Sequence, residues 1–492
     1  MERSIPILSV ATRRDWLFLA LITVLALVLR LVRLDAALWY DEIETLVKFA
    51  RLPFSEIATT FTSFNNHVLF SLQAHLSLSI FGESNAALRA PAVVFGVATV
   101  PVMWLLMRQI DAPMRWAHAT AILLALNYHM IWFAQNARGY SGIVFWCLLA
   151  TLFMARLWTK PRLFDWLGFV IAAACAGYTH LSAGFVIAAL SLVFAARALA
   201  SARGDRRHGI VTAIIATAVL VAILYLPVMG GILSMFSPAT EGAPTQQASR
   251  ISLQGIRYTL WAVTNAVPIG GGLLLLLAAA MAVVVAAGMV EIGRRAPWIL
   301  MILLVQLVVT IAMLMTAKLL IYPRYFLFAL PFLVAFVVAG TDWAAAVLAR
   351  LPVPGLSQSR LFILGITIGV VISALWAVRN YAHPKQDFAG AVAAAGKLAQ
   401  PGDVVASVGL AAFPISRHYA PDWPVIRQVS GLRRLMDDTK GDVWLIYGFE
   451  RNLQRMEPSL MTMIRRDFQD VTRFPGTLGD GAVYLVRAAG AR

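Results

Sequence analysis

The sequence has few charged residues and almost no cysteine. Of its 492 residues, 13% are charged and 60% are hydrophobic, and the mean hydropathy is +0.75, whereas soluble domains carry about a quarter charged residues. Both cysteines, Cys147 and Cys175, fall within apolar runs, which excludes a disulfide scaffold and a cysteine-rich metal site. The composition is that of an integral membrane protein.

Motifs for soluble nucleotides and for metal centres are absent from the sequence. It contains no Gly-rich phosphate loop, no dinucleotide fingerprint and no Gly-x-Ser-x-Gly elbow. It also lacks the His-x-x-x-His and Cys-x-x-Cys spacings that are typical of metal ligands. We therefore expect no soluble nucleotide donor and no obligatory cofactor, and we leave open whether a divalent cation takes part.

Apolar stretches long enough to cross a bilayer recur along most of the chain. About eleven segments approach the roughly 20 residues that a 30 Å hydrocarbon core requires. They are 16–34, 88–107, 116–134, 141–158, 165–179, 182–200, 209–229, 265–290, 297–317, 325–348 and 361–378. The first follows Arg13 and Arg14 and shows no cleavage pattern, so we interpret it as an uncleaved anchor.

The net charge of +16 would suggest a nucleic-acid partner in a soluble protein. Here the basic residues concentrate in alternate short loops, as the positive-inside rule requires if the N-terminus is cytoplasmic. We therefore attribute the charge to membrane topology and expect no nucleic acid. The same assignment places the loop 35–87 and the tail 379–492 on the outer face. The Ala-rich composition favours a bacterial inner membrane.

The tail differs in composition from the rest of the chain, because polar residues return and the apolar runs shorten to strand length. The pattern predicts one helix over 387–399 and short strands over 403–408, 442–447 and 482–486. We thus predict an α-helical polytopic domain over 1–378 followed by a small extracytoplasmic α/β domain over 379–492. The tail could bind the acceptor, cover a cavity or recruit a partner.

The loop 35–87 combines carboxylates with helical periodicity. Its apolar spacing predicts two short amphipathic helices lying flat at the lipid surface. Asp41 and Glu42 fall at the start of the first helix, where carboxylates suit the positive end of the helix dipole. Two interpretations stay open, namely helix capping beside an aromatic belt and a catalytic carboxylate at the membrane boundary.

Further polar residues are expected on the same face, at the ends of apolar spans. They are Asn66, His67, Gln135, Asn136, Arg138, Tyr140, His180, Lys318, Arg324 and Tyr325. An arginine between two apolar spans is costly unless it faces water, protein or an anion. Arg138 and Arg324 therefore either contact headgroups or carboxylates, or bind a phosphate. For His67 and His180, packing or hydrogen bonding is favoured over metal ligation.

Four short motifs follow one another along the chain. They are Trp39-Tyr40-Asp41-Glu42, Asn66-His67-Val68-Leu69, Gln135-Asn136-Ala137-Arg138-Gly139-Tyr140 and Arg324-Tyr325. In this order they resemble the bacterial branch of the dolichyl-phosphate-mannose protein mannosyltransferase superfamily, which includes aminoarabinose transferases. The chain departs from the family at Val68, where the family often has proline, and at Asn136, where it often has glutamate.

The resemblance implies a GT-C glycosyltransferase that moves a sugar, with inversion, from a polyprenyl-phosphate donor to a glycolipid, polysaccharide or other extracytoplasmic acceptor, amid membrane lipids. It implies Asp41 as the general base and Glu42 as its positioning partner. The donor phosphate would be held by Arg138, Lys318, Arg324 and Tyr325, and substrate by Tyr40, Asn66, His67, Tyr140 and His180. The alternatives are a protein O-mannosyltransferase and, outside catalysis, a transporter or flippase for lipid-linked sugars.

Overall fold

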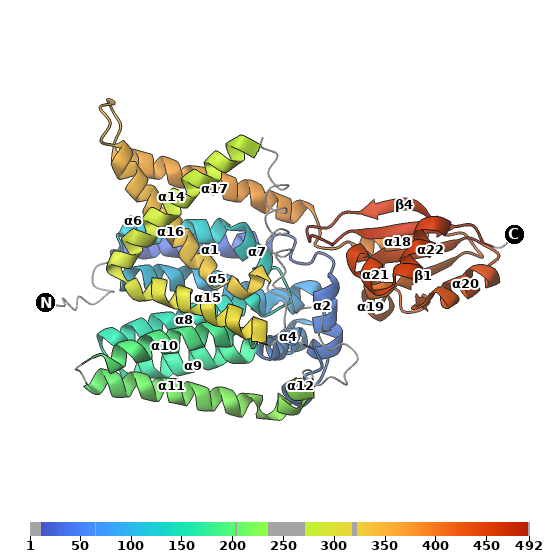
Figure 1. The fold of residues 1–492 in the computed structure, drawn as a ribbon, viewed down its shortest axis with the longest axis horizontal. Coiled ribbons are helices and arrows are strands. Elements are labelled where there is room, and N and C mark those ends of the chain that lie inside the picture. The colour runs from blue at the N-terminus through green and yellow to red at the C-terminus, as the bar shows by residue number, and fades with distance from the viewer. Residues whose placement is uncertain (1–10, 64, 202–203, 235–270, 317–321, 491–492) are drawn as a thin grey trace. The chain divides into compact units, whose positions relative to one another are not determined.

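The computed structural model describes residues 11–63, 65–201, 204–234, 271–316 and 322–490 (Figure 1). The chain packs as two compact units. The first unit consists of Met1–Val32, Phe54–Leu76 and Arg89–Ala377, and the second of Arg33–Pro53, Ser77–Leu88 and Val378–Arg492. Two stretches of the long first loop therefore pack with the C-terminal tail in the second unit.

Helices make up the first unit and extend into the second. In chain order they are α1 (Arg13–Leu31), α3 (Phe54–Thr59), α4 (Val68–Phe81), α5 (Asn85–Gln109), α6 (Met114–Leu126), α7 (Tyr128–Ala134), α8 (Tyr140–Thr159), α9 (Leu163–Thr179), α10 (Ala183–Leu199), α11 (Gly204–Tyr225), α12 (Met229–Ser234), α14 (Gly271–Arg295), α15 (Pro297–Thr316), α16 (Ala329–Leu348) and α17 (Gln358–Ala382). The predicted α-helical polytopic fold is confirmed.

Seven of the described helical segments are long and apolar enough to cross a membrane. They are α5, α8, Gly204–Ser234, Leu275–Arg295, α15, α16 and α17. The other predicted spans coincide with α1, with α6 and α7 together, and with the shorter helices α9 and α10. Residues 265–270 of the eighth predicted span lie outside the described residues, and the number of spans stays a prediction.

A buried arginine explains how one broken span is tolerated. The backbone at Asn127 is extended (ψ 124°), and its side chain accepts a hydrogen bond from the Met130 amide at 3.1 Å, so α6 ends and α7 begins there. Arg30 is fully buried and donates to the Leu124 and Ala125 carbonyls at 3.4 and 3.1 Å. These are carbonyls that the end of a helix leaves without an intrahelical partner.

Glycine allows α14 and α16 to pack with their backbones in contact. A Cβ atom on Gly288 would lie 1.8 Å from the Phe336 carbonyl oxygen, and one on Gly340 would lie 1.8 Å from the Val284 carbonyl oxygen. Close approach through small residues is the usual means of helix association in a bilayer, where apolar burial gives no driving force.

Both helices predicted in the loop 35–87 are present. The first is α2 (Tyr40–Thr45), which continues into the wider turn η2 (Leu46–Ala50), and the second is α3. Ile43 and Leu46 of the first and Ile57 of the second are buried, whereas Phe54, at the start of the second, is 47% exposed. Their location at a lipid surface stays a prediction.

The tail forms a five-stranded sheet with the order β2-β1-β3-β5-β4. Its strands are β1 (Val404–Val408), β2 (Val425–Ile426), β3 (Val443–Gly448), β4 (Gln469–Phe474) and β5 (Val483–Ala488). β1 pairs in parallel with β2 and β3, whereas β5 pairs antiparallel with β3 and β4. The three predicted strands and the predicted helix, α18 (Phe388–Leu398), are confirmed, and β2 and β4 were not predicted.

Helices cover both faces of this sheet (Figure 1). α18 packs on the face that presents Trp444 and Ile446, whereas α20 (Val429–Asp438) and α22 (Pro458–Asp467) pack on the face that presents Leu445 and Tyr447. Successive side chains of a strand point to opposite faces, so a central strand covered on both sides is apolar throughout. β3 is accordingly buried at all six positions.

Candidate active site

Glu42 and Asp41 differ in what they do at the start of α2. Glu42 is fully buried, and its Oε2 atom accepts a hydrogen bond from the backbone amide of Trp39, the N-cap residue, at 3.4 Å. A carboxylate at the third helical position commonly reaches back to the N-cap in this way. Asp41 is half-buried and lies between Tyr40 and Glu42 in the first turn of α2. Capping therefore accounts for Glu42, and the catalytic role of Asp41 stays a prediction.

Tyr40 packs in the second unit. Its ring centroid lies 5.7 Å from that of Phe413 and 5.3 Å from that of Phe449. Burial raises the pKa of the Tyr40 hydroxyl, and the Glu44 and Asp41 carboxylates raise it further. The phenol is therefore protonated at neutral pH. The Tyr40 ring therefore has a packing role, and its predicted contact with substrate stays a prediction.

Three of the predicted substrate-binding residues lie together in the first unit. The His67 ring centroid is 4.4 Å from that of His180 and 4.9 Å from that of Tyr140. Asn66, directly before His67, donates to the Thr60 carbonyl at 2.9 Å and accepts from the Ser71 hydroxyl at 3.1 Å. Asn66 therefore fixes the turn that leads into α4, and His67 faces a histidine and a tyrosine from other helices.

The environment of His67 keeps its imidazole neutral. The side chain is 1% exposed, and neither ring nitrogen has a hydrogen-bond partner within the described part of the chain. Burial lowers the pKa of His67 well below its ordinary value of 6.5, and the charges of His180, Arg138 and Arg324 lower it further. A neutral imidazole offers one N–H donor and one acceptor nitrogen to a ligand.

Both predicted phosphate-binding arginines reach this cluster. The Arg138 guanidinium carbon lies 4.9 Å from the centre of the Tyr140 ring, and that of Arg324 lies 5.9 Å from the centre of the Tyr325 ring. We call these six residues the arginine–histidine cluster: His67, Arg138, Tyr140, His180, Arg324 and Tyr325.

The cluster is chemically suited to an anion. Guanidinium groups donate paired hydrogen bonds that match phosphate oxygens, and they keep their charge when desolvated. The two arginines come from motifs far apart in the sequence, yet the charges of both lower the pKa of His67. Lys318, the remaining predicted phosphate ligand, lies outside the described residues.

The turn between α7 and α8 positions Arg138 and Tyr140. The Arg138 amide donates to the Asn136 carbonyl at 2.6 Å, and the Gln135 side chain donates to the carbonyls of Arg30 and Val32 at 3.0 and 2.7 Å. A Cβ atom on Gly139 would lie 2.8 Å from His67 Nδ1. Gly139 lies within one of the sequence motifs but was not predicted as a site residue, although its place between an arginine and a tyrosine was a signal for it.

No metal centre is evident in the described part of the chain. Among those residues, no three His, Cys, Asp or Glu side chains are grouped so as to hold an ion. The involvement of a divalent cation therefore stays open.

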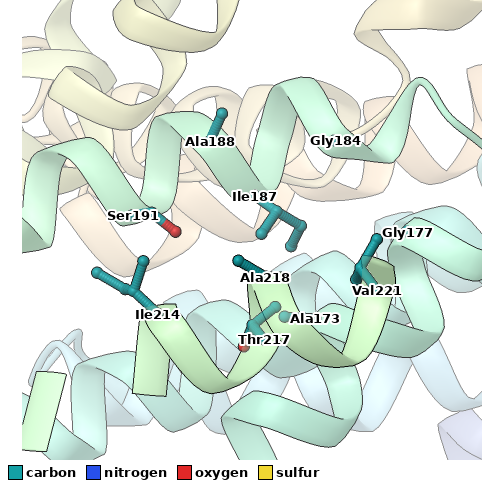
Figure 2. A pocket seen from close by; sticks show the side chains of 10 residues that line it. All are labelled: Ala173, Gly177, Gly184, Ile187, Ala188, Ser191, Ile214, Thr217, Ala218 and Val221. Atoms are coloured by element: carbon teal, nitrogen blue, oxygen red, sulfur yellow. The ribbon is translucent and has the colours of Figure 1, made fainter. Parts of the chain in front are cut away.

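An apolar cavity of about 250 Å³ lies among α9, α10 and α11 (Figure 2). Its lining is Ala173, Gly177, Gly184, Ile187, Ala188, Ser191, Ile214, Thr217, Ala218 and Val221. The hydroxyls of Ser191 and Thr217 are its only polar side-chain groups. Because it contains no titratable group, this cavity has no means of acid–base catalysis, and the arginine–histidine cluster is the better candidate site.

Known proteins resemble the chain in sequence and in fold. Residues 68–230 match the family model described as dolichyl-phosphate-mannose-protein mannosyltransferase. No curated protein matches the sequence. The oligosaccharyltransferase of Archaeoglobus fulgidus, solved with Zn and sulfate, matches with a TM-score of 0.54 at 12% identity, over 92% of this chain and 71% of that one.

A second similar structure is ArnT from Cupriavidus metallidurans. In its apo state it matches with a TM-score of 0.52 at 14% identity, over 97% of this chain and 99% of that one. ArnT bound to undecaprenyl phosphate gives a TM-score of 0.49 at 14% identity, over 98% and 100% of the two chains.

The chain shares the fold of these structures, with a helical unit whose apolar helices are long enough to cross a membrane and a small C-terminal sheet region. This fold agrees with the GT-C architecture that the motif resemblance implied, and the match of residues 68–230 to the mannosyltransferase family model agrees with it as well. Its assignment to the bacterial branch stays a prediction.

Proposed function

We propose that the protein is an inverting glycosyltransferase that moves a sugar from a polyprenyl-phosphate carrier to an acceptor on the outer face of a bacterial inner membrane. The observation that carries this proposal is the convergence of Arg138 and Arg324 on the neutral, buried His67, in a chain with the GT-C fold. ArnT, which shares that fold, has been solved with undecaprenyl phosphate, a carrier of the proposed class.

The proposed donor is an anionic lipid whose tail stays in the bilayer. Arg138 and Arg324 would bind its phosphate, and His67 would donate its single N–H to a phosphate or sugar oxygen. Tyr140, Tyr325 and His180 would complete the donor pocket, and Lys318 is a further proposed ligand. A hydrogen-bond donor that is fixed in place to face the negative charge developing in the transition state typically stabilises that state by about 3 kcal/mol.

Transfer requires one base and one leaving group. The Asp41 carboxylate would take the proton of the acceptor hydroxyl while that oxygen attacks the anomeric carbon from the face opposite the phosphate. The bond between the anomeric carbon and the phosphate oxygen breaks, and the polyprenyl phosphate leaves with the electron pair. Arg138 and Arg324 would stabilise the added negative charge. A single displacement inverts the anomeric centre and needs no covalent glycosyl-enzyme.

The acceptor is proposed to be a glycolipid, a polysaccharide or another extracytoplasmic hydroxyl compound. A protein hydroxyl is the second candidate, which the match of residues 68–230 to the protein mannosyltransferase model favours. The charge distribution of the loops supports an outward-facing site. A transporter or flippase would share the anion-binding residues but would release the lipid-linked sugar unchanged.

Mass spectrometry of the protein purified in native lipid tests donor binding and consumption together. We expect the wild-type protein to retain a polyprenyl-phosphate sugar and to convert it, on addition of a membrane extract, into free polyprenyl phosphate and a glycosylated acceptor. Arg138→Ala should retain less carrier, because a phosphate contact is lost. If the bound lipid is translocated in proteoliposomes but never cleaved, the transporter hypothesis replaces this one.

A further inference from the structure

The α2 helix is too short to be stable by itself. It has six residues before the wider turn η2 begins, and isolated helices of fewer than about 12 residues are marginal in water. Its position must therefore come from tertiary contacts. Those contacts are in the second unit, to which both α2 and the tail belong.

The tail holds α2 at its N-terminal end. The Tyr40 amide donates to Oε1 of the fully buried Gln386 at 3.3 Å. The Tyr419 hydroxyl donates to the Leu38 carbonyl at 2.7 Å. These two hydrogen bonds fix the backbone on both sides of Trp39, the N-cap residue of α2.

Aromatic packing adds a second set of contacts. Tyr40 lies against the hydrophobic cluster that α18 forms with the sheet, where Phe413 and Phe449 contact its ring. The Lys48 ammonium lies 5.1 Å from the centre of the same Phe413 ring. Phe413 therefore contacts the start of α2 and the turn that follows it.

Phe449 adopts a backbone conformation that L-residues avoid. Its φ and ψ are 53° and 50°, in the left-handed region, which costs about 1–2 kcal/mol for a residue with a side chain. Strained backbone persists where the surroundings hold it in place and often accompanies a functional requirement. Here the strained residue is the one whose ring meets Tyr40 edge-on, at an interplanar angle of 83°.

We infer that the tail acts as a positioning element for the proposed general base, with Phe413, Phe449 and Gln386 as positioning residues that act on Asp41 through Tyr40. The inference rests on the proposed function, since it assumes that Asp41 takes the acceptor proton. Asp41 directly follows Tyr40, so each contact that fixes Tyr40 also fixes the backbone from which the carboxylate projects. The structure thus gives the tail a part in catalysis that requires no contact of its own with substrate.

The test uses the full-length protein and the variants Phe413→Ala, Phe449→Ala and their double variant. All three act on half-buried side chains and leave the fully buried core of the sheet intact. Hydrogen exchange followed by mass spectrometry should show at least 10-fold faster exchange over residues 38–50 of the double variant, with β3 and β5 unchanged. In transfer of the carrier-linked sugar that the wild-type protein consumes, kcat should fall about 10- to 100-fold, since misplacement of a catalytic group by about 1 Å is that costly.

The division of the effect between kcat and KM separates positioning from a general structural role. The donor KM should stay within about threefold of wild type, because the arginine–histidine cluster belongs to the first unit. Phe413→Leu, which keeps an apolar side chain against Tyr40, should recover most of the rate. Tyr484→Phe is the matched control, since it removes a hydroxyl bonded to Glu450 in the same unit and should leave the rate unchanged.

Parallel measurement of Asp41→Asn distinguishes failure of the positioning inference from failure of the proposed function. If Asp41→Asn is inactive while the double variant transfers at the wild-type rate, the positioning inference is wrong and the proposed function stands. If Asp41→Asn transfers normally, the catalytic assignment on which the inference depends is wrong. Unchanged exchange over residues 38–50 in the double variant overturns the inference whatever the activity.

Discussion

Gly139 and His67 are in such close contact that a side chain at position 139 would displace its neighbours: a Cβ atom there would lie 2.8 Å from His67 Nδ1 and 2.5 Å from the Thr179 methyl group. Gly139 precedes Tyr140, the first residue of α8, and follows Arg138. The missing side chain therefore allows the turn that carries both residues to approach the imidazole.

Gly139→Ala should displace His67 or the turn that carries Arg138. Overpacking of a buried contact typically costs about 1–3 kcal/mol, so we expect a lower Tm of the detergent-solubilised protein together with reduced sugar transfer. Gly184→Ala is the matched control, because a Cβ atom at position 184 meets nothing within 4 Å. Equal behaviour of the two variants would show that the contact at Gly139 is unimportant.

The depressed pKa of His67 predicts loss of stability in acid. In the unfolded chain the imidazole takes up a proton near pH 6.5, whereas in the folded protein burial holds its pKa well below that value. As pH falls through 6.5, the unfolded state therefore binds more protons and gains stability, by up to about 1.4 kcal/mol per pH unit. His67→Gln should flatten this part of the Tm profile. Superimposable profiles for wild type and variant between pH 7 and 5 would contradict the assignment.

Arg30→Leu should destabilise the first unit although it removes a charge from an apolar span. The substitution leaves the Leu124 and Ala125 carbonyls without the donor that reaches them from α1. Each unsatisfied buried polar group costs about 1–3 kcal/mol. Arg30→Leu should therefore lower the free energy of unfolding by more than Arg51→Leu does. Arg51 forms an exposed ion pair with Glu83, and such pairs contribute about 0–1 kcal/mol. A comparison of the two unfolding midpoints checks the order.

Phe449→Gly and Phe449→Ala should separate backbone strain from ring packing. Both remove the ring that contacts Tyr40, but only glycine adopts a φ of 53° at little cost. We expect the glycine variant to be about 1 kcal/mol more stable than the alanine variant. Equal stability would mean that the left-handed backbone at this position stores no strain.

Much of the fold could be predicted because its signals are local. Long apolar runs predicted the helices, and short apolar runs predicted β1 and β3. The two strands follow the turn sequences Pro401-Gly402-Asp403 and Lys440-Gly441-Asp442. β4 was missed because its residues, among them Asp470 and Arg473, are exposed and carry no apolar alternation. β2 has two residues, which is too short to leave a pattern.

The candidate site was predicted only in part, because its decisive contacts are between distant residues. The members of the arginine–histidine cluster could be named from motifs and, for His180, from its place at the end of an apolar span. Their convergence on one imidazole depends on how α4, α8, α9 and the turn before α16 pack. The contact of Tyr40 with Phe413 and Phe449 had no sequence signal, since α2 and the sheet are separated by most of the chain. The same periodicity that predicted α2 could not show that Glu42 caps it.

The rate of sugar transfer by Asp41→Asn tests the central claim most directly. The substitution keeps the size of the side chain and removes its ability to take a proton, so transfer should fall about 10²- to 10⁴-fold, while the purified variant still retains the polyprenyl-phosphate carrier. Transfer at the wild-type rate by a variant that binds the carrier normally would contradict the assignment of Asp41 as the general base.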